Sequence, residues 1–437
     1  MTKQIHSGIA AGQVPEGYKL EHGYVIPKEW KVVHFNECFH RLTQKNTENN
    51  QNVLTISAQQ GLISQLDYYN TLYASEDKTG YFLLQKGDFA YNKSYSADYA
   101  YGAIKQLEKY DKGIVSPLYI CFSANEGTNT DFYRQYFEAG MFNREIYKIA
   151  QEGARNHGLL NVSTPEFFSA VLVFPPVEEQ KKIAEVLSCC NRVIELKQQL
   201  IAEMQQLKSG FLQAMFPAKG HSEPDIRFPE FSGDWEQRKL LDCVEKITDF
   251  RGRTPKKLGM DWSESGYLAL SALNVKDGYI DFTQDVHYGN QELYDKWMTG
   301  NELHKGQVLF TTEAPMGNVA QVPDNRRYIL SQRTIAFSVK EDLITENFLA
   351  TILRSPNVIA TLTALSSGGT AKGVSQKSLS TVAIIIPNDL GEQERLANTF
   401  LELDHLITLH QRELEETKKK KKSLAKLLLT GSVRVPT

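Results

Sequence analysis

A short basic loop is the part of the sequence whose side chains could do chemistry most directly. The stretch FRGRTPKK (250–257) places two arginines and two lysines around a glycine and a proline. Arginine can pair bidentately with guanine, and both residue types contact the phosphates of a duplex. A solvated surface loop often has the same composition, so that alternative stays open. The candidate nucleic-acid contacts in this loop are Arg251, Arg253, Lys256 and Lys257.

Further loops combine small residues with side chains that can read base edges. Asparagine can bond adenine, and glutamate can accept a hydrogen bond from cytosine. Ordinary turns have the same composition, so each loop also has a purely structural interpretation. The candidates are Arg155, Asn156 and His157 in GARNHG (153–158), Asn92, Lys93 and Ser94 in YNKSYS (91–96), Glu313 in TTEAPMG (311–317), and Lys372 in SSGGTAKG (366–373).

No pattern in the sequence supplies a catalytic or metal site. The tetrapeptides typical of amino-methyltransferases are absent, and DFAY (88–91) has their ends without the prolines. SSGGTAKGVS (366–375) has glycines without the spacing of a phosphate loop. No cluster has metal-ligand spacing, and the five cysteines form no CxxC pair. We expect a binding protein, although an active site dispersed along the chain would leave no such pattern.

Length and composition limit the kind of protein that positions these loops. The chain has 437 residues, of which 41% are hydrophobic and 23% are charged, and a formal net charge of −3. That length predicts two or more domains. No apolar run is long enough to span a membrane, and the first residues lack the apolar core of a signal peptide, so we expect a cytoplasmic protein. Attraction to nucleic acid would have to come from local patches or from a partner subunit.

The chain repeats one layout. The stretches PPVEEQKKIAEVLSCCNRVIELKQQLI (175–201) and PNDLGEQERLANTFLELDHLITLHQREL (387–414) both begin with proline, reach a Glu-Gln pair and continue at helical spacing. Matches in a shared order precede them, which predicts a duplicated unit of a globular domain followed by a long helix. The matches are PKEWKVVHFNEC (27–38) with SGDWEQRKLLDC (232–243), LTISAQQGLI (54–63) with LALSALNVKDGYI (268–280), KGDFAYN (86–92) with KGQVLFT (305–311), and ICFSA (120–124) with IAFSV (335–339).

Each globular half is predicted to be α+β. Short apolar or alternating runs predict strands, which Gly, Asn and Asp clusters separate. Helices are expected at DFYRQYFEAGMF (131–142) and ITENFLATILRS (344–355). The expected strands are VLTIS, YFLLQ, GIVSPLYICF and AVLVFPP in the first half, and YLALS, QVLFTT, TIAFSVK and VAIIIP in the second.

The two long helices have apolar residues at alternating spacings of four and three, the heptad pattern of helices that pack along their length. Polar residues fall at matching heptads, Lys197 with His410 and Lys208 with Lys421, as expected for two helices that pair in a fixed register. Separate dimerising coiled coils are the alternative. The expected helix-pair seam consists of Ile183, Leu187, Ile194 and Ile201 in the first helix and Leu396, Phe400, Leu403, Ile407 and Leu414 in the second.

Two features of these helices lie outside the seam. The first helix has a second apolar row, which predicts contact with more than one surface. In the second helix, the run TKKKKKS (417–423) would point lysines in all directions, so we expect a solvated face rather than a nucleic-acid contact. The second apolar row consists of Val186, Val193, Leu200 and Leu207.

At these residues the chain resembles the specificity subunits of Type I restriction-modification systems, over essentially its whole length. The resemblance also includes RGRTP (251–255) at the head of the second domain and the closing LLLTG (427–431). The first half departs from it, because HRLTQKNTENN (40–50) lacks the Gly-x-Thr-Pro element, so contact residues are not transferred between the halves. The helix-start residues that carry the resemblance are Pro175, Glu179, Gln180, Ile183 and Ala184, then Pro387, Glu392, Gln393, Leu396 and Ala397.

The resemblance implies an α+β fold with two similar globular target recognition domains and pseudo-twofold symmetry. Two long helices, packed as an antiparallel coiled coil, would separate these domains. The expected segments are an N-terminal tail (1–20), target recognition domain 1 (21–176), a central spacer helix (177–216), a linker (217–234), target recognition domain 2 (235–388), a C-terminal spacer helix (389–430) and a tail (431–437).

The resemblance also implies a non-catalytic role in directing methylation and restriction. Each globular domain would read one half of a bipartite site on double-stranded DNA. The helix pair would set the spacing and dock two methyltransferase (M) subunits, and motor-nuclease (R) subunits would complete the complex. No cofactor is expected in this chain, because the methyl donor and ATP would bind the partner subunits, and no membrane is involved.

Two other classes of function are the alternatives. One is an enzyme, a fused nuclease or methyltransferase with its own active site, against which the missing cofactor motifs argue. The other is a scaffold whose repeated domains bind protein or glycan. The second domain has no excess of basic residues. We therefore expect the isolated chain to bind DNA weakly, with methyltransferase subunits supplying much of the affinity.

Overall fold

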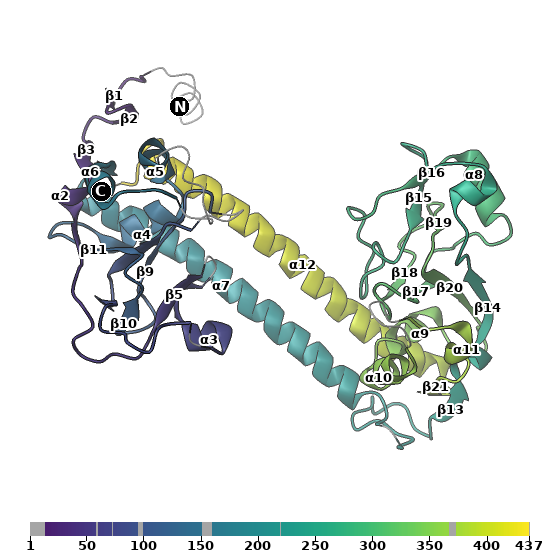
Figure 1. Ribbon diagram of the computed structural model, residues 1–437. Coiled ribbons are helices and arrows are strands. Elements are labelled where there is room, and N and C mark those ends of the chain that lie inside the picture. Colours follow the sequence, from purple (N-terminus) through teal and green to yellow (C-terminus); the bar gives the residue numbers. More distant parts are fainter. Residues whose placement is uncertain are drawn as a thin grey trace. The chain divides into compact units, whose positions relative to one another are not determined.

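The computed structural model describes seven stretches of the chain, which divide into two compact units. Unit 1 is Met1–Leu196 with Leu414–Thr437, and unit 2 is Lys197–Glu413. Helices α7 (Val177–Ala214) and α12 (Leu390–Leu429) each begin in one unit and end in the other (Figure 1). The described stretches are residues 14–57, 60–71, 73–94, 99–150, 160–218, 220–366 and 373–436.

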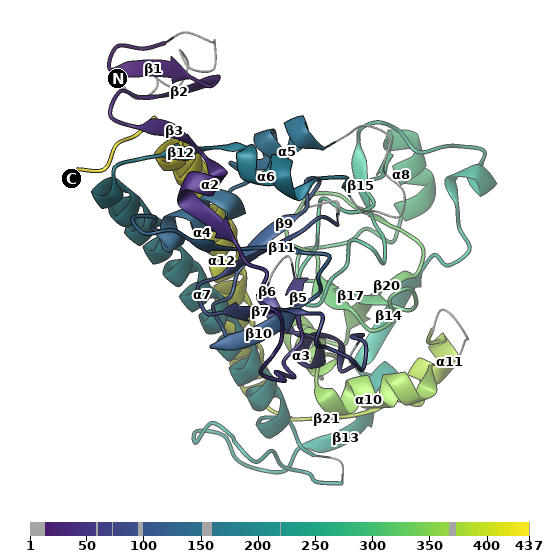
Figure 2. The same cartoon turned by 60° about the vertical axis from the view of Figure 1, so that its left-hand side comes forward.

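A four-stranded antiparallel sheet with the order β4-β11-β8-β9 is the centre of unit 1. Strand β3 pairs with β12, which leads into α7. Helix α4 (Thr130–Glu138) packs on β9, and its aromatic side chains join the core that includes the start of α7 (Figure 2). The strands are β3 Lys31–His34, β4 Phe39–Arg41, β8 Phe89–Asn92, β9 Ala103–Gln106, β11 Ile120–Ala124 and β12 Val171–Phe174.

Smaller elements complete the described part of unit 1. Strand β1 (Tyr18–Glu21) pairs with β2 (Tyr24–Pro27), β5 (Leu54–Ser57) with β6 (Gly61–Ser64), and β7 (Phe82–Gln85) with β10 (Lys112–Val115). The short helices are α2 (Phe35–Cys38), α3 (Gln65–Tyr69), α5 (Asn143–Ile149) and α6 (Thr164–Ser169).

Unit 2 has a sheet of the same topology, with the order β14-β20-β17-β18. Strand β13 pairs with β21, which leads into α12. A second sheet, in the order β16-β15-β19, covers its own core around Trp297. The elements are β13 Glu236–Lys239, β14 Val244–Asp249, β15 Tyr267–Leu270, β16 Tyr288–Gly289, β17 Val308–Thr311, β18 Val319–Gln321, β19 Ile329–Leu330, β20 Thr334–Val339 and β21 Ala383–Ile386, with helices η2 Leu240–Cys243, η3 Pro255–Leu258, α8 Gln291–Met298, α9 Glu346–Ile352, α10 Pro356–Leu365 and α11 Gln376–Leu379.

The predicted duplication is confirmed, because the two four-stranded sheets have the same order and each unit joins an early strand to the strand before its long helix. The eight runs expected as strands all contain observed strands. The two shorter helices are confirmed with shifted ends. Asn129 and Thr345 cap their starts by accepting a backbone N–H, and Pro356 begins a new helix after α9.

Helices α7 and α12 pack against each other in antiparallel directions. In unit 1, Leu187 near the start of α7 shares a buried cluster with Leu428 near the end of α12. In unit 2, Phe400 near the start of α12 lies 5.9 Å, between ring centroids, from Phe216 just beyond the end of α7. The prediction that the two helices pair with each other is therefore confirmed, and the alternative of separate dimerising coiled coils is wrong.

Ion pairs connect the two helices inside unit 2. Lys197 Nζ lies 2.7 Å from Glu413, and Lys208 Nζ lies 2.7 Å from Asp404. The residues of the second apolar row of α7 are between 37% and 49% exposed, as are Leu196 and two leucines of α12. A second surface for this row stays a prediction. These exposed residues are Val186, Val193, Leu196, Leu200 and Leu207 in α7 and Leu406 and Leu409 in α12.

In the part of the chain that the structure describes, no single helix is long and apolar enough to cross a membrane. The bent pair of α9 and α10 meets that test by length and composition alone, with a bend of 67°. Its residues Phe348 and Leu349 are fully buried in the core of unit 2.

Candidate nucleic-acid interface

Four loops of unit 2 meet at one place and carry most of the residues that the sequence singled out in that half. The Val374 N–H donates to the Thr312 carbonyl over 2.9 Å, and the Thr312 N–H donates to the Arg333 carbonyl over 2.8 Å. Gln332 Nε2 donates to the Arg253 carbonyl over 2.6 Å. These bonds place the loops beside one another. We define the unit 2 loop cluster as residues 249–257, 311–317, 331–333 and 373–376.

Arg251 is held by a carboxylate of its own loop. Its Nε and Nη2 donate to Asp249 Oδ2 over 2.8 and 2.6 Å, and Gln376 Nε2 donates to the same oxygen over 2.8 Å. Burial would raise the pKa of Asp249, but these hydrogen bonds outweigh it and hold the pKa below its usual range. Arg251 therefore reaches the surface as half of an ion pair, with its orientation fixed.

Arg253 anchors the loop to helix α8. Its Nη1 donates to the Trp297 carbonyl over 2.8 Å, and its guanidinium lies 4.4 Å from the centre of the Phe250 ring. The neighbouring Gly252 has φ +78°, a conformation that favours glycine. Lys257 Nζ donates to the Gly252 carbonyl over 2.6 Å and so closes the turn. These contacts give Arg253 a structural role, and its contact with DNA stays a prediction.

Lys256 is the side chain of this loop that is most available to a ligand. It is exposed, and within the described ranges it makes no ion pair and its side chain no hydrogen bond. Its backbone is fixed by helix η3, where the Thr254 side chain caps the turn. An ammonium group presented in this way can contact a phosphate at little conformational cost.

Arg333 is a member of the cluster that the sequence analysis missed. Its Nε lies 2.9 Å from Glu313 Oε1, and about half of its side chain is exposed. Its φ of +66° is uncommon for a residue with a side chain, and such positions are often functional. Nothing in the stretch SQRT (331–334) signals that conformation. The salt bridge shows that Glu313 is already paired, as Arg251 is.

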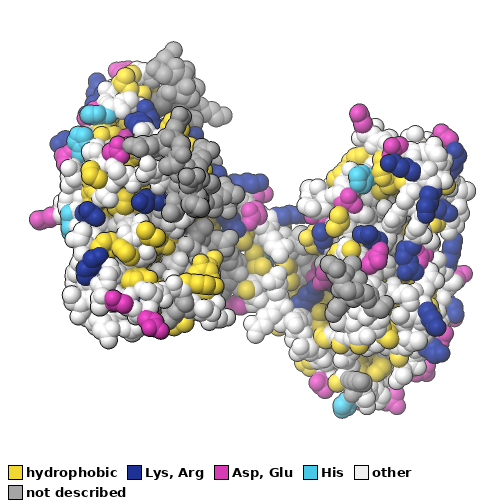
Figure 3. Space-filling model, viewed as in Figure 1, with side chains coloured by type: hydrophobic (Ala, Val, Ile, Leu, Met, Phe, Trp, Pro, Cys, Tyr) yellow, Lys and Arg dark blue, Asp and Glu magenta, His cyan; other side chains and the backbone are white. Residues whose placement is uncertain are grey.

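The unit 2 loop cluster has five cationic side chains and two carboxylates, although unit 2 as a whole mixes both signs. Figure 3 shows basic and acidic side chains interspersed over the visible face of unit 2. The local excess is therefore a property of these loops. The cations are Arg251, Arg253, Lys256, Lys257 and Arg333, and the carboxylates are Asp249 and Glu313.

The corresponding strand end in unit 1 carries Asn92, Lys93 and Ser94. Strand β8 occupies the place of β17 in its sheet, so these residues stand where Thr311 to Glu313 stand in unit 2. Asn92 Oδ1 accepts the Ser94 N–H over 3.0 Å, which makes a tight local turn. The other predicted contacts, Arg155, Asn156, His157 and Lys372, lie outside the described residues. The base-reading roles of all these residues stay predictions.

A second polar site in each unit fixes the long helix to its globular domain. Glu179 is fully buried and accepts a hydrogen bond from Trp30 Nε1 over 2.8 Å. The Arg434 guanidinium donates to both carboxylate oxygens of Glu179, over 2.6 and 2.8 Å. In unit 2, the Arg227 guanidinium likewise donates to both carboxylate oxygens of Glu392, over 2.7 and 2.8 Å. We define the helix-start sites as Trp30, Glu179, Gln180 and Arg434 in unit 1 and Trp235, Glu392, Gln393 and Arg227 in unit 2.

The glutamine beside each glutamate ties three elements together. Gln180 Nε2 donates to the Pro175 carbonyl over 2.8 Å, and its Oε1 accepts the Asn129 N–H at the start of α4 over 3.1 Å. Gln393 makes the same pair of bonds, and its Oε1 accepts the Thr345 N–H at the start of α9 over 3.0 Å. The repeated Glu-Gln pair is therefore a structural anchor and not a DNA contact.

The chain matches known proteins along nearly its whole length. Residues 232–419 match the family model of the Type I restriction modification DNA specificity domain. The chain is 24% identical, over 96% of both chains, to the Type I restriction enzyme MjaVIII specificity subunit of Methanocaldococcus jannaschii. It is also 24% identical to the MjaX specificity subunit of that organism, over 97% of this chain and 98% of the relative. Residues 232–419 thus match a Type I DNA specificity domain, and the chain as a whole is similar to Type I specificity subunits.

Solved structures have the same fold as this chain. One is a chain from a structural study of complex assembly and conformational transition in the type I R-M system, with a TM-score of 0.56 and 16% identity, covering 94% of this chain and all of that one. The other is the Type I restriction-modification S subunit from M. genitalium, with a TM-score of 0.53 and 11% identity, covering 94% and 97%. In the described part of this chain, no group of three or more His, Cys, Asp or Glu side chains could hold a metal ion.

Proposed function

We propose that this chain is the sequence-recognition subunit of a Type I restriction-modification complex and reads a bipartite DNA site. Each globular domain would read one half of the site. The observation that supports this most is the repetition of one sheet topology with polar loops at equivalent strand ends, β8 in unit 1 and β17 in unit 2. Phosphate contacts would position each domain, and base-edge contacts would give its specificity.

The helix pair would set the distance between the two half-sites. Helix α7 has 38 residues, which at 1.5 Å per residue gives a rod of roughly 57 Å. The buried anchors at the helix starts would transmit that rigidity to each globular domain. In other DNA readers the spacing of half-sites likewise follows the geometry of the protein.

The exposed apolar row on α7 would dock the methyltransferase subunits, two for each specificity subunit. An apolar row at heptad spacing suits helices of a partner that pack along it. Motor-nuclease subunits would complete the restriction complex. The methyl donor and ATP would bind those partners, and the chemistry of methylation and cleavage would be theirs.

The test is to purify the chain with its methyltransferase partner and to map methylated positions in genomic DNA. The proposal predicts a motif of two short sequences separated by a gap of constant length. Methylation by the chain alone would instead support an enzyme with a dispersed active site. Binding of protein or glycan without any methylation motif would support the scaffold alternative.

A further inference from the structure

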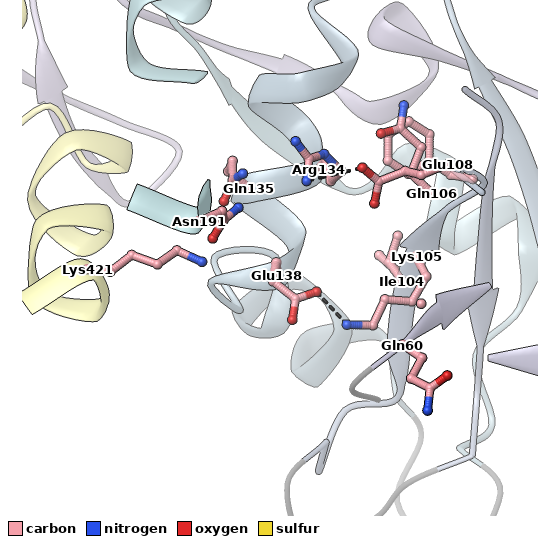
Figure 4. A pocket seen from close by; sticks show the side chains of 12 residues that line it. Gln60, Ile104, Lys105, Gln106, Glu108, Arg134, Gln135, Glu138, Asn191 and Lys421 are labelled. Atoms are coloured by element: carbon pink, nitrogen blue, oxygen red, sulfur yellow. Dashed lines mark hydrogen bonds and ion pairs between the residues drawn. The ribbon is translucent and has the colours of Figure 1, made fainter. Parts of the chain in front are cut away.

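A polar cavity of about 230 Å³ lies in unit 1 between α4, β9 and the two long helices (Figure 4). Lys421 extends from α12 toward Asn191 and Glu138, and Lys105 meets Glu138 from the other side. The volume is many times the roughly 10–15 Å³ that one water centre needs, so the cavity can hold a larger group. The polar residues used below are Lys105, Glu108, Arg134, Gln135, Glu138, Asn191 and Lys421.

The helix-start sites show which residues of the two units occupy equivalent places. Asn191 stands as far along α7 from Gln180 as Asp404 stands along α12 from Gln393. By the same measure, Lys421 of α12 corresponds to Lys208 of α7. Glu138 corresponds to Arg354, because each stands equally far along the chain from the residue that caps its helix, Asn129 for α4 and Thr345 for α9. The list of three correspondences is Asn191 with Asp404, Lys421 with Lys208, and Glu138 with Arg354.

In unit 2 the residues at these positions are connected by a chain of ion pairs. Asp404 lies 2.7 Å from Lys208 Nζ and 2.7 Å from Arg354 Nη1. Arg354 Nε lies 2.5 Å from Asp277. The bridging carboxylate of Asp404 thus neutralises the lysine that reaches in from the opposite long helix.

In unit 1 the bridging carboxylate is missing, because an amide, Asn191, replaces it. Lys421 is partly buried and has no ion pair or side-chain hydrogen bond with any residue that the structure describes. The charge of Glu138 acts on Lys421, but this carboxylate already accepts hydrogen bonds from Lys105 and from the Tyr99 hydroxyl. Burial lowers the pKa of Lys421 and nearby Glu138 opposes this, so the ammonium lacks the partner that Lys208 has in unit 2.

Two further donors around the cavity lack an acceptor. Gln135 is only 3% exposed, and its Nε2 has no hydrogen-bond partner in the described structure. Arg134 Nε is likewise buried and has no hydrogen-bond partner in the described structure. The terminal nitrogens of Arg134 lie 3.3 Å from Glu108 and 3.5 Å from Asp131. A buried donor without an acceptor costs about 1–3 kcal/mol. The cavity lining has three cations and two carboxylates, an excess of one positive charge.

We propose that this cavity binds a small oxyanion of carboxylate or phosphate type, with Lys421 and Gln135 as donors. Such an anion would occupy the role that the Asp404 carboxylate has in unit 2. A single negative charge would balance the lining, and its oxygens would accept from the unpaired donors. The occupant would tie α12 to α4 through unit 1, and this inference does not depend on how the protein reads DNA.

The test measures the melting temperature of the full chain in sodium acetate, sodium phosphate and sodium chloride at equal ionic strength. We expect acetate or phosphate to raise the melting temperature in a saturable way, by roughly 2–4 °C at ten times the dissociation constant. The acetate and phosphate arms tell the two kinds of anion apart. Lys421→Met should abolish the rise, and Lys420→Met, which removes a neighbouring exposed lysine, should keep it.

A second variant separates anion binding from a general effect of the lysine. Asn191→Asp places in unit 1 the carboxylate that unit 2 has at Asp404. It should raise the melting temperature in chloride and remove the response to acetate and phosphate. An equal anion response in the wild type and in Lys421→Met would overturn the proposal, as would no response in the wild type or an unchanged response in Asn191→Asp.

Discussion

At the scale of single residues, buried carboxylates connect elements of the fold, whereas an exposed cation is available to a ligand. Glu179 and Glu392 are almost fully buried and each is gripped by one arginine and one tryptophan. A buried ion pair contributes little net stability, but breaking one leaves an uncompensated charge. Lys256, an exposed cation of the unit 2 loop cluster, has the opposite property, since its loss should cost the fold little.

The first prediction concerns the anchor of α12. Glu392→Gln should lower the free energy of unfolding by about 3 kcal/mol, because Arg227 is left partly buried without its carboxylate. Urea denaturation followed by circular dichroism would measure this. Glu292→Gln is the matched control, since Glu292 forms an exposed i,i+4 pair with Lys296, and it should cost less than about 0.5 kcal/mol. Equal losses in both variants would contradict the assigned role of Glu392.

The second prediction separates two cations of the same loop. Lys256→Ala should leave stability unchanged and weaken binding of the assembled complex to every duplex. The slope of log K against log salt should fall by about 0.9, the value for one phosphate contact. Arg253→Ala should instead destabilise unit 2 by about 1–2 kcal/mol, because it loses the bond to Trp297 and the contact with Phe250. DNA titrations at several salt concentrations distinguish a phosphate contact from a structural role. An unchanged slope in Lys256→Ala would show that Lys256 does not contact DNA.

At the scale of elements, the paired helices have a buried inner seam and an exposed outer row, and we expect substitutions in the two to have different effects. Phe400→Ala should destabilise the protein by about 3–5 kcal/mol, since the ring is buried between elements of unit 2. Val193→Ala, on the outer row, should change stability by less than about 0.5 kcal/mol. Val193→Asp should prevent co-purification of the methyltransferase subunit while the chain stays folded. Normal assembly by Val193→Asp would show that the outer row docks nothing.

The ion pairs that join α12 to unit 2 predict a pH dependence. Burial would raise the pKa of Asp404, but its bonds to Arg354 and Lys208 outweigh this and lower it below its usual range. Its contribution to stability is therefore complete above about pH 4 and is lost as pH falls through the lowered folded pKa. Asp404→Asn should be less stable at pH 7 and lose less stability between pH 5 and 2. Urea unfolding midpoints measured across that pH range check this. The same loss of stability with falling pH in Asp404→Asn and in the wild type would contradict the role of Asp404.

The elements were largely predictable from sequence, whereas the contacts between distant segments were not. Apolar period and turn residues predict strands such as β17 and both long helices, because these signals are local. Arg434 was missed as the partner of Glu179, because the two residues are 255 positions apart in the sequence. A signal exists in hindsight: VRVP (433–436) repeats IRFP (226–229), and each segment supplies the arginine of one helix-start site. The conformation of Arg333 has no such signal.

At the scale of the whole molecule, one polypeptide carries two copies of a domain whose sheets agree in topology and whose loops differ. The Gly-x-Thr-Pro loop of unit 2 has no counterpart in the sequence of unit 1. The described part of unit 1 has the two-stranded sheets β5-β6 and β10-β7, whereas unit 2 has the three-stranded sheet β16-β15-β19. The shared parts are the sheet, the helix-start site and the long helix. Shared supporting elements with different loops are what the proposal of two domains that read different DNA sequences requires.

The most direct test of that account replaces residues 235–386 with the corresponding domain of a Type I specificity subunit and maps the methylated sites. The account predicts that one half of the bipartite motif changes, while the other half and the length of the gap stay as they were. A motif that changes in both halves, or a gap that changes with the domain, would contradict the account of two independent readers held by one helix pair.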